Sequence, residues 1–149
     1  MAVQNYQSDP VYQQWLGTLG FLESNANRSA DNQRTQVANQ ADFAREGAGI
    51  DRDRMIENVG SNFENRGLTR SGEHLRRRAE GLRDSSRQFG AIELDTAGRL
   101  AGIDDNLATQ LAQYQLQNSD RMFDAEGRRA AQAAADYDFA QRRAFAQAG

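Results

Sequence analysis

The chain has 149 residues, with 18 basic and 21 acidic side chains, and its net charge of −3 gives no overall positive field for binding nucleic acid or an acidic membrane. The absence of cysteine excludes disulfides, thiol catalysis and cysteine-based metal sites. Mean hydropathy is −0.84, and 23 alanines leave 34 larger apolar residues, which is little for a thick globular core. Such a composition supports thin apolar seams between helices, and a thin seam needs a partner.

No apolar run approaches the ~20 residues that are needed to span a bilayer. The first residues also lack the charged and apolar regions of a signal peptide. We therefore expect a protein without a transmembrane segment that is soluble when it is made.

The most hydrophobic stretch lies in residues 1–22. Ser8-Asp9-Pro10 predicts a helix start, because a capping side chain precedes a proline that suits the first helical position. Large apolar side chains follow at helical spacing, and we expect them to dock on a partner protein: Val11, Tyr12, Trp15, Leu16, Leu19, Phe21 and Leu22. A membrane-inserting helix is the alternative, but its polar face would be rich in basic residues, and residues 1–27 contain none.

Residues 23–66 form a polar segment in which the apolar residues nevertheless keep to one helical stripe. The stripe consists of Val37, Ala41, Ala44, Ala48, Met55, Val59 and Phe63. It is narrow and rich in alanine. Gly47 and Gly49 interrupt it, so we expect a kink or break near Gly47 to Ile50, with Asp51 as a candidate cap.

A helix stop predicts a tight corner over residues 67–71. Gly67 suits the left-handed conformation that ends many helices. Leu68 after it can contact Phe63, which is the contact that accompanies such a stop.

A new helix is expected to begin directly after the corner. Ser71 or Thr69 would cap it, and Glu73 in its first turn suits the positive helix end. The predicted fold class is therefore all-α, with long helices that meet at a helix-turn-helix corner near Gly67–Ser71. Whether they fold back as an extended hairpin or coiled-coil-like bundle, or extend end to end, stays open.

Residues 72–149 predict one long helix, in which we expect at least one break at a glycine. Its early spacing is heptad-like, through Leu75, Ala79, Leu82, Ser86 and Phe89. From Phe89 onward a 3-4-4 step describes the apolar residues, and this eleven-residue repeat keeps a stripe nearly straight along a helix. We expect copies of the chain to bundle through the large residues of this helix-packing seam: Phe89, Ile92, Leu100, Ile103, Leu107, Leu111, Tyr114 and Met122.

Candidates for catalysis or metal binding fail one at a time. His74 is the one histidine, and no second base or ligand accompanies it in the sequence, so a solvated or capping role is preferred. Asp104 and Asp105 point about 100° apart on a helix and lack a surrounding calcium loop. The sequence therefore predicts no enzyme activity, cofactor, metal or small-molecule substrate.

Basic residues gather just after the corner, where Arg76, Arg77 and Arg78 follow one another. They are candidates for contact with an anionic partner such as DNA. Arg76 and Glu80 are also spaced for an intrahelical ion pair, so we favour a protein interface or a solvated face over nucleic acid.

Three features together resemble short virion proteins of tailed bacteriophages, of the neck-associated or tail-associated type. They are the start Asp9-Pro10-Val11-Tyr12 with Trp15-Leu16 and Leu19-Gly20, the corner Arg66-Gly67-Leu68-Thr69-Arg70-Ser71-Gly72, and the long Arg/Ala/Gln helix that follows. The resemblance implies a structural component of the neck or connector, tail or tail tip, present in symmetric copies and without catalytic residues to transfer.

We therefore expect a homo-oligomeric virion protein, made in the host cytoplasm, that docks on other virion proteins through its N-terminal helix. Two alternatives stay open. One is an internal or ejected phage protein that contacts DNA or the host envelope, and the other is a cellular coiled-coil adaptor or scaffold.

Overall fold

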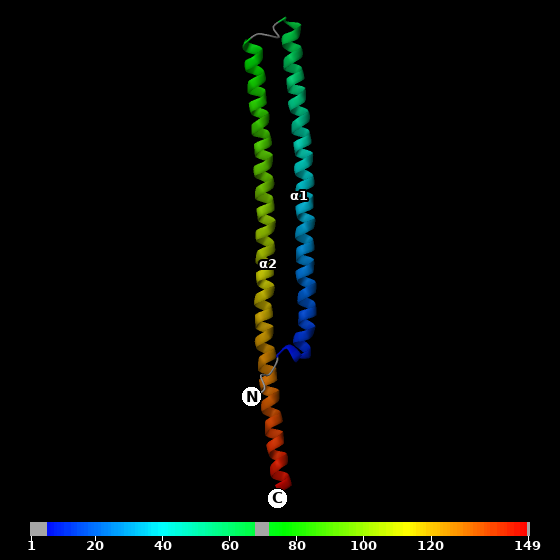
Figure 1. Ribbon diagram of the computed structural model, residues 1–149, viewed down its shortest axis with the longest axis vertical. Helices are drawn as coiled ribbons and strands as arrows, with labels where there is room; N and C mark the ends of the chain where they lie inside the picture. Colours follow the sequence, from blue (N-terminus) through cyan, green and yellow to red (C-terminus); the bar gives the residue numbers. More distant parts are fainter. Residues whose placement is uncertain (1–5, 68–71, 149) are drawn as a thin grey trace. The chain divides into compact units, whose positions relative to one another are not determined.

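A computed structural model describes residues 6–67 and 72–148, and nearly all of these residues are helical (Figure 1). A short 3₁₀ helix, η1, covers Tyr6–Ser8, and two long helices follow, α1 over Pro10–Asn65 and α2 over Gly72–Ala148. No strand occurs in the part of the chain that the structure describes. The all-α prediction is confirmed.

The chain divides into two compact units, each of which contains a stretch of both helices. Unit 1 consists of Met1–Ser29 and Asn106–Gly149, and unit 2 consists of Ala30–Asp105. Within unit 2, the side chains of Arg34 and Asp104 form an ion pair, and the rings of Phe63 and His74 lie 5.0 Å apart. The two helices therefore pack against each other in antiparallel directions within this unit (Figure 1).

Unit 1, taken by itself, has the same antiparallel arrangement. Asp9 at the start of α1 pairs with Arg128 of α2, and the indole of Trp15 donates a hydrogen bond to Asn118. Of the arrangements left open by the sequence, the structure has the one in which the helices pack together.

Helix α1 begins at the predicted position. The carboxylate of Asp9 accepts hydrogen bonds from the backbone N–H groups of Val11 and Tyr12, at 2.9 and 3.0 Å, just before Pro10 opens the helix. These are donors that the first helical turn leaves without a partner inside the helix, so Asp9 acts as the N-cap.

The other end of α1 also follows the prediction as far as the structure describes it. Gly67 has a φ of 68°, in the left-handed region, and its N–H donates to the carbonyl oxygen of Glu64 at 3.0 Å. This is one of the two hydrogen bonds of a Schellman stop. Leu68, Thr69 and Ser71, which were expected to complete the corner and cap the next helix, lie outside the described residues.

The expected breaks at glycine are wrong, because α1 is one helix through Gly47–Ile50 and α2 is one helix from Gly72 to Ala148. The apolar and polar segments that were predicted to meet between residues 22 and 23 both lie in α1. A glycine costs a helix about 1 kcal/mol, and packing of one face against another helix outweighs such a cost. Ala48, between two of these glycines, is 2% exposed against α2.

The seam between the helices follows the eleven-residue repeat. From Phe89 to Ala133, the side chains of α2 that are buried or half-buried are those reached by the 3-4-4 step from Phe89, including Thr96, Asn118 and Arg129. The buried residues of α1 recur with the same period, which separates Ala26, Val37 and Ala48 and also separates Ala30 and Ala41.

The heptad-like start of α2 is placed differently from the prediction. Leu75 and Leu82 are 61% and 40% exposed, and Ala79 and Ser86 are also exposed. Ser85 is buried instead, and the side chain of Met55 fills the space beside Gly81. Ser85 and Gly81 continue the 3-4-4 step backward from Phe89, so the same repeat describes this part of the seam.

Replacing Gly67 by alanine tests the conformation at the end of α1. A Cβ is strained at a φ of 68°, so Gly67→Ala is expected to lower the free energy of unfolding by about 1–2 kcal/mol in urea melts. Gly98→Ala is the matched control, since Gly98 lies inside α2 with open space around it, and it should raise the stability by up to about 1 kcal/mol. If the two substitutions changed the free energy of unfolding equally, the left-handed conformation of Gly67 would be contradicted.

Candidate functional site

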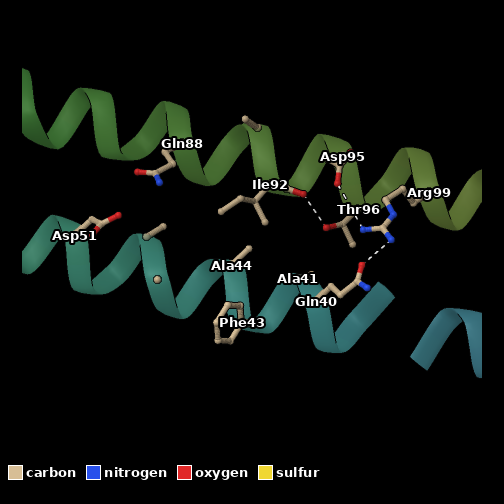
Figure 2. Close-up of a pocket in the computed structure, with 13 residues that line it drawn as sticks. Gln40, Ala41, Phe43, Ala44, Asp51, Gln88, Ile92, Asp95, Thr96 and Arg99 are labelled. Carbon is tan, nitrogen blue, oxygen red and sulfur yellow. Dashed lines mark hydrogen bonds and ion pairs between the residues drawn. The ribbon is translucent and has the colours of Figure 1, made fainter. Parts of the chain in front are cut away.

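An open groove of about 560 Å³ runs along one side of the seam in unit 2 (Figure 2). Its floor is made of small or apolar residues because both helices present such residues at this level: Ala41, Ala44, Gly47 and Ala48 of α1, and Ala91, Ile92 and Thr96 of α2. The ring of Phe43, which is 79% exposed, stands at its edge. The groove is therefore an apolar surface that the chain itself leaves open.

Three of the polar residues around this groove, Gln40, Asp95 and Arg99, are bound to one another. Arg99 donates to the side-chain oxygen of Gln40 at 2.6 Å and pairs with Asp95 at 4.0 Å, as Figure 2 shows. The hydroxyl of Thr96 donates to the carbonyl of Ile92 in its own helix. Of these contacts, the Arg99–Gln40 hydrogen bond joins α2 to α1 and the other two lie within α2, and none of them brings a nucleophile beside a base.

Two ion pairs on the seam repeat at the eleven-residue spacing. Arg34 contacts Asp104 at 2.6 Å, and Arg45 contacts Glu93 at 2.7 Å. The hydrogen bond to Asp104 raises the pKa of Arg34, and the bond to Glu93 raises the pKa of Arg45 while the pKa of Glu93 is lowered. Each arginine also reaches an acid three residues before it, Asp31 or Asp42. The Arg34–Asp104 and Arg45–Glu93 ion pairs fix which residues of α1 face which residues of α2.

Two of the predicted docking residues, Tyr12 and Trp15, are held by α2 of the same chain. The hydroxyl of Tyr12 and the indole N–H of Trp15 both donate to the side-chain oxygen of Asn118, at 3.1 and 3.3 Å. The guanidinium of Arg121 lies 5.2 Å from the centre of the indole ring. Tyr12 is 4% exposed, so this part of the predicted anchor docks within unit 1.

The remaining docking residues divide into two groups. Leu19 and Leu22 are half-buried, whereas Val11, Leu16 and Phe21 are 50%, 41% and 66% exposed. The residues of the predicted helix-packing seam lie along the face of α2 that the 3-4-4 step defines. Ile103 is buried and the others are half-buried: Phe89, Ile92, Leu100, Leu107, Leu111, Tyr114 and Met122.

Charged residues of α2 hold the start of α1 in unit 1. Arg128 contacts the carboxylate of Asp9 at 3.2 Å, and Arg129 donates to the carbonyl of Ser8. The hydrogen bond from Arg128, together with those from the backbone of Tyr12 and Val11, holds the pKa of Asp9 below its ordinary value of 3.8. No local pattern predicts this pairing between α1 and α2, because its partners are more than a hundred residues apart in the same chain.

Two of the three arginines predicted to contact an anionic partner near the corner instead form ion pairs with acidic residues of their own helix. Arg77 lies 3.3 Å from Glu73 and 5.9 Å from the centre of the buried Phe63 ring. Arg76 lies 3.9 Å from Glu80, as its spacing predicted. Arg76, Arg77 and Arg78 are all exposed.

The last part of α2 has no cover within unit 1. Every residue from 134 to 148 is exposed, including Tyr137, Phe139 and Phe145 at 66%, 68% and 78%. Within residues 6–67 and 72–148, no group of three acidic or histidine side chains is placed to hold a metal ion. Over the same residues, neither helix has a stretch long and apolar enough to cross a bilayer.

Comparison with family models, with curated proteins and with solved structures gives no match to this chain.

Replacing Asp9 by asparagine tests its charged interaction, because asparagine keeps the cap and loses the ion pair with Arg128. The native pKa of Asp9 lies below 3.8, so its charged form stabilises the fold fully above that pH, and this contribution is lost as the pH falls through the native pKa. In thermal melts, the wild type should have a higher melting temperature than Asp9→Asn at neutral pH. The difference between the two melting temperatures should shrink as the pH is lowered. A gap that does not change with pH would contradict the assignment.

Replacing Asn118 by leucine tests the polar contact at the seam. The change removes the acceptor shared by Tyr12 and Trp15, and an unpaired buried hydroxyl costs about 1–3 kcal/mol. Urea unfolding should show this loss, and the emission of the single tryptophan should change. Gln117→Leu, at the exposed neighbouring position, is the control and should leave both nearly unchanged. A leucine at 118 that stabilises the protein would contradict this account.

Proposed function

We propose that this protein is a non-enzymatic helical assembly module of a tailed-bacteriophage virion, in the neck, tail or tail tip. It would act by covering its exposed apolar side chains with copies of itself and with neighbouring virion proteins. Its helices would form part of a larger bundle rather than a complete core.

The observation that carries this proposal is the distribution of hydrophobic exposure. Among the described residues, no large side chain is less than 2% exposed. Large apolar side chains stand in solvent on both helices, with Phe43 at 79%, Leu94 at 78% and Phe123 at 73%. Exposed apolar surface bordered by polar residues is typical of sites that bind other proteins.

The charge distribution supports the same proposal. Pro10–Leu22 of α1 and Asn106–Ser119 of α2, both in unit 1, contain no charged residue, although a quarter of the chain is charged. Depletion of charge is a mark of the centre of a protein interface. By contrast, Arg76 and Arg77 are each within ion-pair distance of an acid, which favours a protein partner over nucleic acid.

The virion is proposed as the place of assembly on the strength of the sequence resemblance. The start at Asp9-Pro10, the corner at Gly67 and the long helix after it are the features that carry it, and the structure has a cap, a left-handed glycine and a continuous helix at those positions. Symmetric copies in a neck or tail would supply the partners that the apolar surfaces need.

Two measurements test the proposal. Sedimentation of the purified chain over about a hundredfold range of concentration should show mass-action association into discrete oligomers. Mass spectrometry of density-purified particles from the infected host should find the chain as a stoichiometric component. A chain that stays monomeric throughout and is absent from the particles would overturn the proposal.

A further inference from the structure

One face of α2 in unit 1 is apolar and faces away from α1. It is reached by the same 3-4-4 step as the seam, on a different side of the helix, and consists of Ala108, Ala112, Leu116, Ser119, Phe123, Gly127, Ala130 and Ala134. All eight residues are exposed, and Leu116 and Phe123 are 68% and 73% exposed. We call this face the outer stripe of α2.

The outer stripe carries no charged residue, although α2 has many. Its two large side chains stand among small ones, so a second helix could approach closely on either side of them. Because its step matches that of the α1–α2 seam on the same helix, a second helix with this repeat would stay in contact along its length without supercoiling to the left.

The order of large and small residues along the outer stripe is self-complementary. If two copies of α2 run antiparallel with a two-fold axis near residue 121, Phe123 faces Ser119 and Leu116 faces Gly127. The alanines then face one another, with Ala112 opposite Ala130 and Ala108 opposite Ala134. In a parallel pair, each phenylalanine would instead meet a phenylalanine while the alanines left gaps.

From this match we infer that the occupant of the outer stripe is the outer stripe of a second copy, packed antiparallel about a two-fold axis near Arg121. A two-fold interface uses the same patch on both partners, which is the symmetry that the residue order has. The inference rests on the proposed assembly function and names the first contact in it.

The size of the surface sets the strength of the pair. From Ala108 to Ala134 the helix rises roughly 40 Å, and a strip about 10 Å wide gives a footprint on the order of 400 Å² per partner. The total of about 800 Å² lies below the roughly 1,200 Å² at which stable specific interfaces begin, in the range of weak and transient contacts. The dimer should therefore dissociate on dilution, and association with further copies or partners would be needed for a permanent complex.

Cysteine cross-linking tests both the contact and its direction, because the chain has no cysteine of its own. Ala112→Cys and Ala130→Cys variants of the full chain, mixed and mildly oxidised, should form covalent dimers containing one of each, since a disulfide needs Cβ atoms about 4 Å apart. Each variant alone should give at least about fivefold less product. Gln110→Cys mixed with Gln132→Cys is also centred on residue 121 but lies on another exposed face, and should give only background.

A double substitution tests the same contact without cysteine. Leu116→Gln combined with Phe123→Gln should weaken dimerisation in sedimentation by about tenfold or more, with helicity by circular dichroism unchanged, because both side chains are exposed in the single chain. Phe139→Gln, at an exposed position outside the stripe, is the control. Asp120→Asn should strengthen the dimer about two- to fivefold, since the two carboxylates would lie close to the axis.

The outcomes separate this inference from the proposed function. Cross-linking of each cysteine variant with itself, or mixed product no greater than the glutamine control, overturns the antiparallel contact. If the chain still associates in sedimentation after that result, the assembly function stands and only this contact is wrong. A chain that is monomeric at every concentration overturns this contact, and if it is also absent from the particles it overturns the proposed function as well.

Discussion

Alanines of α1 and larger apolar residues of α2 meet along a seam that recurs every eleven residues, and the other features of the structure depend on that contact. In unit 2, Ala41 and Ala48 line the same groove as Ile92 (Figure 2), and the Arg34–Asp104 and Arg45–Glu93 pairs beside it have the same period. An eleven-residue repeat has about 3.67 residues per turn, close to the ~3.6 of a straight helix, so the stripe stays in register along the helix.

A seam of this kind aligns two helices but hides little surface. One alanine-rich face can cover one side of its partner, so residues such as Ile92, Leu107 and Leu111 stay half-buried, and Phe43, Leu94 and Phe123 stay exposed. Hydrophobic burial scales with the area removed from water, so the isolated chain gains less than a globular domain of the same length would. Association adds the missing burial, which is why the proposed function is assembly.

Local signals were enough to predict much of the fold. Asp9 before Pro10 gave the start of α1, Gly67 gave its end, and the 3-4-4 step gave the face of α2 that meets α1. The errors arose where tertiary packing decides: the glycines near Ile50 suggested a break that packing of Ala48 prevents, and Leu75 and Leu82 suggested a heptad face that is exposed. Asn118 interrupted the apolar pattern in the sequence, yet it binds Tyr12 and Trp15, a role that depends on contacts between distant residues.

The central claim is that this chain depends on other chains for part of its stability. Urea unfolding followed by circular dichroism at two protein concentrations, about a hundredfold apart, tests it most directly, because association with the folded state raises apparent stability by mass action. The account predicts a midpoint that moves to higher urea in the concentrated sample. A cooperative transition with the same midpoint at both concentrations would contradict it.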